Sequence, residues 1–241
     1  MILNKKLIKK IKKIKGVHHM KELSNGYLVE RLNVESNIKS AGVIEVQAMP
    51  GEPSEYKNRV LNLFGGFDRA TISEMMKQCL KWEEEDAEIL YKHSQQIRQL
   101  QDPRQLLKPI ILNINSPGGH VDELMALVDM LESMPAPVIT RAYGEIASCG
   151  FVLFCIGDER YVGPNVSLMY HEIAYGIMGK DSEIRNYSEY TKRVQKRIDR
   201  LIKAKTGITL KKLDEWKKSN QDKWLDAEEA VELGIATALL Y

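Results

Sequence analysis

Hydrophobic positions divide the chain into a weakly patterned N-terminal region and a regular body that begins near residue 58. Short apolar runs with strand character occur at 58–64, 110–114, 138–143, 160–162, 167–170 and 236–240. Apolar residues at helical spacing occur at 121–134, 184–206, 210–218 and 227–233, and a further helix begins near Asp68 or Thr71, which can act as N-caps. The run 151–156 is apolar throughout and predicts a buried segment. Strands that alternate with helices in this way predict one α/β core of βαβ units.

The helix that begins near Asp68 changes character along its length. Charged residues dominate from Lys81 to Glu88, and the helix is predicted to continue to about Gln101, before Asp102-Pro103 ends it. We interpret 81–104 as a charged helical insertion that faces solvent.

The N-terminal region has a different pattern. Residues 2–17 predict a short basic amphipathic helix, with lysines placed between the apolar residues Leu3, Leu7, Ile11 and Ile14. Such a helix would suit a membrane surface, a nucleic acid or an acidic partner. The alternative is a poorly ordered leader or a removable propeptide. We assign 1–55 to this extension, with a short strand at 42–46, and 56–241 to one domain.

Charge and cysteine content restrict the possible settings. Removing the seven lysines of the first 15 residues from the formal net charge of +2 leaves −5 for the rest of the chain, so nucleic-acid binding by the body is not expected. The three cysteines form no C-x-x-C pair, which favours a reducing cytoplasm and gives no metal-site pattern. No apolar run approaches the ~20 residues of a membrane-spanning helix.

Two glycine-containing turns could support nucleophilic chemistry. Ser148 follows a strand and precedes an apolar run, and the small neighbours Ala147 and Gly150 allow a sharp turn. A serine there could be a nucleophile at a helix N-terminus, although an ordinary strand-to-helix turn has the same pattern. The turn at 116–119, Ser-Pro-Gly-Gly, could direct backbone N–H groups into a cleft, or could simply connect a strand to a helix.

A histidine and an aspartate complete the candidate set. His171 comes directly after the strand at 167–170, and Asp222 comes before Lys223-Trp224-Leu225. Considered alone, a histidine at this position is usually structural, and Asp222 is compatible with an acid in a solvated loop. Asp226 precedes a helix and is better explained as its N-cap.

The order of these motifs resembles the family of the Clp protease proteolytic subunit, within the ClpP/crotonase superfamily. The resemblance rests on Asn-Ile-Asn-Ser-Pro-Gly-Gly at 113–119, on 144–150, on Met-Tyr-His at 169–171 and on 222–234; 58–80 resembles the preceding strand and first core helix. It implies a fold of repeated ββα units with a protruding handle helix, placed here at 176–206. It also implies a serine endopeptidase that cleaves peptide or protein substrates without a metal or organic cofactor.

The resemblance assigns roles to individual residues. Ser148 would be the nucleophile, His171 the general base and then acid, and Asp222 the carboxylate that orients the histidine. The backbone N–H groups of Gly119 and Cys149 would form the oxyanion hole. The family also implies a homo-oligomer, as a heptameric ring or a double ring.

Several positions depart from the family pattern. Glu172-Ile173 follows the histidine in place of Gln-Pro, and Gln221 replaces an arginine that is associated with contacts between rings. Ile111, Asn113 and Ser133 stand where the family places aromatic residues for its AAA+ unfoldase, which weakens the expectation of that partner. These departures favour a divergent member, for example a bacteriophage protease of capsid maturation.

Three other functions use a similar fold. A crotonase-type acyl-CoA enzyme or a serine–lysine signal-peptide-peptidase relative would not need the complete Ser-His-Asp set. A non-catalytic structural or assembly subunit would be expected to lose a triad member. Retention of Ser148, His171 and Asp222 favours the peptidase.

Overall fold

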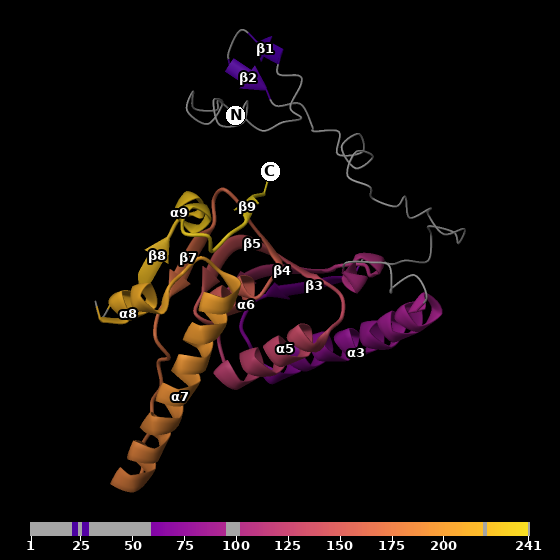
Figure 1. Cartoon of the computed structure of the whole chain (residues 1–241). Coiled ribbons are helices and arrows are strands. Elements are labelled where there is room, and N and C mark those ends of the chain that lie inside the picture. Colours follow the sequence, from indigo (N-terminus) through magenta and orange to yellow (C-terminus); the bar gives the residue numbers. More distant parts are fainter. Residues whose placement is uncertain (1–20, 24–25, 29–58, 95–101, 219–220, 241) are drawn as a thin grey trace. The chain divides into compact units, whose positions relative to one another are not determined.

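The computed structural model describes residues 21–23, 26–28, 59–94, 102–218 and 221–240 (Figure 1). The chain forms two compact units, Met1–Tyr56 and Lys57–Tyr241. The described part of the first unit is an antiparallel pair of strands, β1 (Lys21–Leu23) and β2 (Gly26–Leu28). The helix predicted at 2–17 and the strand predicted at 42–46 lie outside the described residues.

The second unit alternates strands and helices, which confirms the predicted α/β class. Its elements are, in chain order, β3 (Val60–Phe64), α3 (Arg69–Lys92), the 3₁₀ helix η1 (Pro103–Leu106), β4 (Ile110–Ser116), α5 (Val121–Ser133), β5 (Val138–Ala147), α6 (Cys149–Cys155), β6 (Glu159–Val162), β7 (Ser167–Tyr170), α7 (Asp181–Lys205), α8 (Leu210–Lys218), β8 (Lys223–Leu225), α9 (Ala227–Glu232) and β9 (Ala238–Leu239).

The sheet is parallel except for one strand, and it forks at β5. The main path runs β3-β4-β5-β6-β9, with every pair parallel. The first half of β5 pairs with β6 through Ile139–Ala142, whereas its second half pairs with β7 through Glu145–Ala147. β8 then pairs antiparallel with β7. This fork places the ends of β5 and β7 side by side.

Helices cover the core face of the sheet. In α5 the buried residues are the predicted apolar face, Leu124, Leu127, Val128 and Leu131. All seven residues of α6 are buried, as the uniformly apolar sequence predicted. α6 contacts both β4 and β5, so the helix that follows Ser148 is fixed within the core.

The first core helix is partly buried in its charged stretch, and its predicted continuation towards Gln101 falls largely outside the described residues. α3 ends at Lys92, while 95–101 lie outside the described residues. The expected solvent exposure is wrong for Trp82 and Asp86, which are buried. Asp86 accepts a hydrogen bond of 2.5 Å from Arg59 Nη1, and the same guanidinium lies 6.0 Å from the Trp82 ring centroid. The sequence shows no local signal of this pair, because its members are 27 residues apart.

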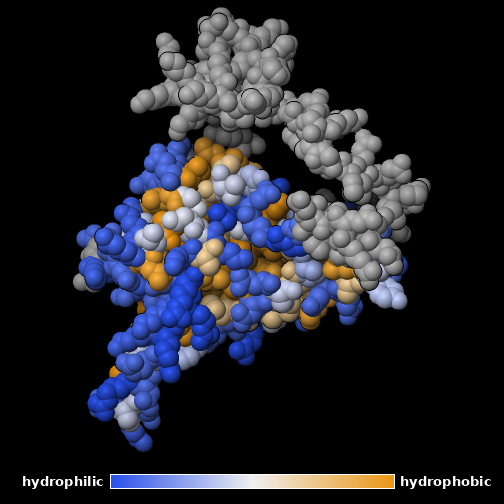
Figure 2. Space-filling view, viewed as in Figure 1, coloured by the Kyte–Doolittle hydropathy of each residue, from blue (hydrophilic) through white to orange (hydrophobic). Residues whose placement is uncertain are grey.

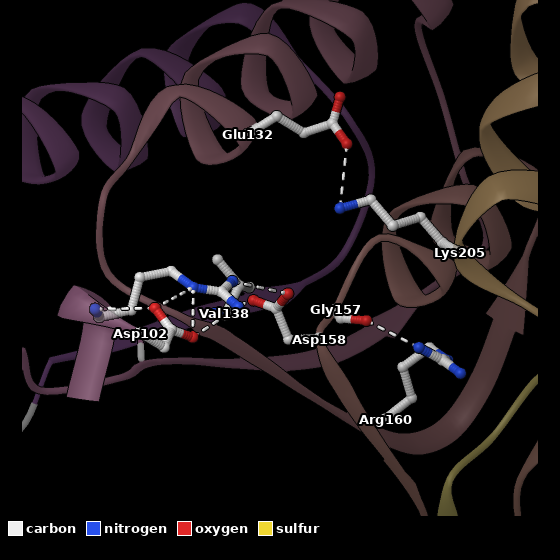
Figure 3. A network of polar contacts seen from close by, with 8 residues as sticks. Asp102, Glu132, Val138, Gly157, Asp158, Arg160 and Lys205 are labelled. Carbon is white, nitrogen blue, oxygen red and sulfur yellow. Dashed lines mark hydrogen bonds and ion pairs between the residues drawn. The ribbon is translucent and has the colours of Figure 1, made fainter. Parts of the chain in front are cut away.

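Polar contacts connect several helices and strands of the second unit (Figure 3). Arg104 Nη1 lies 3.3 Å from Asp158 Oδ1, and Asp158 Oδ2 accepts a hydrogen bond of 2.9 Å from the Val138 N–H. Lys205 at the end of α7 pairs with Glu132 of α5 at 3.1 Å. The first half of α7 projects away from these contacts (Figure 1), and its surface is largely hydrophilic (Figure 2). Its assignment as a handle stays a prediction.

Candidate active site

Ser148 has an unusual backbone conformation. It lies between β5 and α6 with φ 56° and ψ −119°, and it is the only non-glycine residue with positive φ in the described part of the chain. Its N–H donates to the Met169 carbonyl of β7 at 3.0 Å, and its carbonyl accepts from the Val152 N–H at 3.3 Å. A conformation of this kind costs on the order of 1–3 kcal/mol, so the surrounding structure must impose it.

The glycine turn after β4 packs directly against Ser148. Gly118 has φ +104°, and a Cβ added there would lie 2.6 Å from Ser148 Cβ and 3.1 Å from the Cys149 nitrogen. The Gly118 N–H is held by Ser116 Oγ at 3.1 Å. A Cβ on Gly150 would lie 2.8 Å from the Ser116 carbonyl. The turn at 116–119 and the turn around Ser148 therefore pack directly against each other.

Gly119 lies between Phe67 and Cys149. The Phe67 N–H donates to the Gly118 carbonyl and the His120 N–H donates to the Phe67 carbonyl, each at 3.0 Å. On its other side, the Gly119 carbonyl accepts from Cys149 Sγ at 3.3 Å. The structure thus brings together Gly119 and Cys149, the two residues predicted to supply oxyanion donors.

His171 and Asp222 are brought together by strand pairing. In the antiparallel ladder of β7 with β8, Tyr170 lies opposite Lys223. His171 directly follows this last pair on the β7 side, and Asp222 directly precedes it on the β8 side. Both residues line a cavity of about 230 Å³, which is also lined by Glu172 and Gln221. A second cavity of about 480 Å³ lies between α8 and α9 and also includes Asp222.

The candidate catalytic side chains differ in their exposure to solvent. Ser148 and His171 are half-buried and Asp222 is exposed. In the part of the chain that the structure describes, no hydrogen bond joins the side chains of these three residues. The fold therefore supplies their placement, and side-chain movement would have to supply their alignment.

Burial controls the chemistry of the neighbouring cysteine. Desolvation of the Cys149 thiol raises its pKa to about 11. At neutral pH the group is therefore a thiol and not the thiolate that acts as a nucleophile. Cys149 is consequently a weak competitor of Ser148.

A buried polar cluster behind His171 was not predicted from the sequence. Tyr170 OH donates to Asp199 Oδ1 at 2.8 Å, and Gln195 Nε2 donates to the same oxygen at 2.8 Å. Burial, followed by the charge of Asp199, raises the pKa of the Tyr170 hydroxyl above its usual value. The sequence carries one signal of this cluster. Asp199 is an acidic residue next to Ile198 on the apolar face of α7, although the exposed side of that helix is strongly basic.

Two features are absent from the described residues. No helix there is both long and apolar enough to cross a bilayer. No group of three or more His, Cys, Asp and Glu side chains there could hold a metal ion.

Comparisons with known proteins give consistent matches. A family model described as Clp protease matches residues 81–240. The chain is 34% identical over 134 residues to the ATP-dependent Clp protease proteolytic subunit 2 of Pseudomonas aeruginosa, and 35% identical over 134 residues to subunit 2 of Treponema denticola. Each alignment covers 55% of this chain and 66% of the relative. Subunit 1 of Streptomyces coelicolor is 34% identical over 130 residues, which are 53% of this chain and 58% of that protein. The alignments thus span two thirds or less of the relatives' lengths.

Proposed function

Since the chain belongs to the Clp protease family, we propose that it is a serine endopeptidase whose triad is Ser148, His171 and Asp222. The observation that carries the proposal is the strained Ser148 backbone, packed against Gly118 at the ends of β4 and β5. Strained backbone of this kind is concentrated at active sites, where it presents a reactive group in a fixed direction. Ser148 sits in such a conformation beside β7, the strand that His171 directly follows.

The proposed reaction follows from the roles of these groups. Ser148 Oγ attacks the scissile carbonyl while His171 accepts the hydroxyl proton, and Asp222 orients the imidazole and stabilises its charged form. The N–H groups of Gly119 and Cys149 donate to the oxyanion. His171 then gives its proton to the leaving amine, and an acyl-enzyme on Ser148 remains. Water attacks this ester with His171 as base, which releases the acid product and restores the serine.

The resting structure differs from the arrangement that this reaction needs. His171 must contact both Ser148 and Asp222 during the reaction, and catalytic hydrogen bonds are often long or poorly aligned before substrate binds. We expect bound substrate or assembly to bring the side chains into contact. The exposed position of Asp222 leaves it free to move toward His171.

The assembly is the second part of the proposal. The matched relatives are named as proteolytic subunits of an ATP-dependent Clp protease. By this analogy the chain would form a homo-oligomeric ring or double ring that acts on protein substrates. Cleavage of bacteriophage capsid proteins stays a prediction and cytoplasmic location an expectation, whereas Ile111, Asn113 and Ser133 weaken the expectation of a AAA+ ATPase partner.

Fluorophosphonate labelling of the full chain tests the nucleophile. We expect an adduct on Ser148 of the wild type and none in Ser148→Ala or His171→Ala, with the assembly mass recorded for each sample. Ser167→Ala is the matched control, because this exposed serine lies at the other end of the strand that leads to His171. Equal labelling of Ser148→Ala would place the nucleophile elsewhere. An oligomeric wild type without any adduct would favour the non-catalytic assembly subunit.

A further inference from the structure

A buried carboxylate joins three elements behind the candidate active site. Asp199 of α7 is 5% exposed. Its Oδ1 accepts hydrogen bonds from Tyr170 at the end of β7 and from Gln195 of α7, each at 2.8 Å. Its Oδ2 accepts a hydrogen bond from Lys217 Nζ of α8. One carboxylate thus connects the end of β7, α7 and α8.

The chain is held on both sides of His171. On one side, the buried ring of Tyr170 packs against Phe151 of α6 and Trp216 of α8, each with ring centroids 5.8 Å apart. On the other side, the Ile173 N–H donates to Gln195 Oε1 at 2.8 Å. Gln195 therefore bridges the backbone after His171 to the Asp199 carboxylate.

The same carboxylate reaches the segment that carries Asp222. Lys217 lies in the last turn of α8, five positions before Asp222 in the sequence. His171, Lys217 and Asp222 all line the 230 Å³ cavity. Asp199 thus connects the end of β7, next to His171, to α8, the helix that precedes Asp222 in the sequence.

The cluster is better suited to fixing geometry than to stabilising the fold. Removing a carboxylate and an ammonium group from water is costly, and apolar side chains of similar volume often stabilise a core equally well or better. A buried pair with several directional hydrogen bonds, in contrast, allows few arrangements of its neighbours. Here the neighbours are the two backbone segments that place His171 and Asp222.

We propose that Asp199, together with Gln195 and Lys217, is a positioning group that holds His171 and Asp222 in register for catalysis. This inference rests on the proposed peptidase function. Asp199 touches neither substrate nor the reacting atoms in this scheme, and it acts through Tyr170, Gln195 and Lys217.

The test compares Asp199→Asn and Gln195→Leu with wild-type full-length protein. The readouts are the rate of fluorophosphonate labelling of Ser148, the kcat and KM for a short fluorogenic peptide, and Tm. Because a displacement of about 1 Å can reduce a rate by about 10²-fold, we expect kcat and labelling to fall about ten- to a hundredfold. KM should change by less than about twofold, because substrate contacts are retained. Asp199→Glu should recover part of the lost rate.

Asp214→Asn is the matched control. Asp214 also pairs with Lys217, at 3.0 Å, but it is exposed. We expect this variant to keep the wild-type rate. Gln195 is half-buried, so Gln195→Leu provides a folded variant if Asp199→Asn does not assemble.

The possible results separate the two proposals. Lower Tm with unchanged kcat in Asp199→Asn and Gln195→Leu would show a merely structural cluster and overturn the positioning role. An equal loss of rate in Asp214→Asn would also overturn it, because general charge effects would then explain the result. A wild type that is not labelled at all would overturn the peptidase proposal, and the positioning role with it.

Discussion

Replacing Gly119 by alanine tests the close packing that forms the proposed oxyanion hole. A Cβ at Gly119 would lie 2.6 Å from the Phe67 nitrogen and 2.8 Å from its carbonyl oxygen. These are backbone atoms, so no side-chain rotation can relieve the contact. The segment would have to move by about 1 Å, since unstrained carbon contacts lie near 3.5–4.0 Å. That movement would break the two 3.0 Å hydrogen bonds that join Phe67 to Gly118 and His120.

The cost can be estimated against a matched variant. Gly119 has φ +151° and Gly65 has φ +145°, but nothing lies within 4 Å of a Cβ added at Gly65. Both substitutions carry backbone strain of about 1–3 kcal/mol. Gly119→Ala additionally loses two hydrogen bonds worth about 1 kcal/mol each. We therefore expect Gly119→Ala to lower the free energy of unfolding by about 2 kcal/mol more than Gly65→Ala.

Urea denaturation and labelling kinetics would measure the two effects. A 2 kcal/mol difference corresponds to a Tm difference of about 4–8 °C for a chain of this size. Displacement of one oxyanion donor should also slow labelling of Ser148 by about 10²–10³-fold in Gly119→Ala. Equal stability losses in the two alanine variants would refute the packing of Gly119 on Phe67. Normal labelling in a destabilised Gly119→Ala would instead refute its role as a donor.

Two further predictions concern buried groups. Asp86→Ala leaves the 5% exposed Arg59 guanidinium without its buried partner. We therefore expect urea denaturation to show a loss of about 3–5 kcal/mol in the free energy of unfolding. A loss below about 1 kcal/mol would contradict this, because it is the range of surface salt bridges. Cys149 should resist iodoacetamide at pH 8, because a pKa of about 11 leaves only about one thiol in a thousand ionised, and alkylation should become faster as pH rises towards 11. Mass spectrometry of folded and urea-unfolded samples would check this, and equal alkylation of both at pH 8 would contradict it.

Local patterns predicted the secondary structure wherever periodicity was strong. The apolar faces of α5 and α7 repeat over several turns, and both helices lie within a few residues of the predicted bounds. Asp226 was interpreted as an N-cap, and its side chain indeed accepts from the Glu229 N–H at 2.7 Å. These features depend on neighbours within four positions, which a sequence displays directly.

The features that were missed depend on distant neighbours. β8 has three residues and no useful alternation, and it exists because it pairs with β7, more than 50 residues earlier. The contact between Tyr170 and Asp199 spans 29 positions. Neither has a local signature, because the pairing of β7 with β8 and the packing of α7 on the core create them.

The sheet topology explains why the candidate residues lie at one edge of the sheet although they are far apart in the sequence. β4, β5 and β7 are parallel neighbours, so their carboxyl ends lie at one edge of the sheet. The turns that follow these three strands carry Gly119, Ser148 and His171. Asp222 reaches the same edge differently, because it comes immediately before an antiparallel strand. Its position therefore depends on β8 and on the contact of Lys217 with Asp199, so the polar cluster should affect the His171–Asp222 contact more than the placement of Ser148.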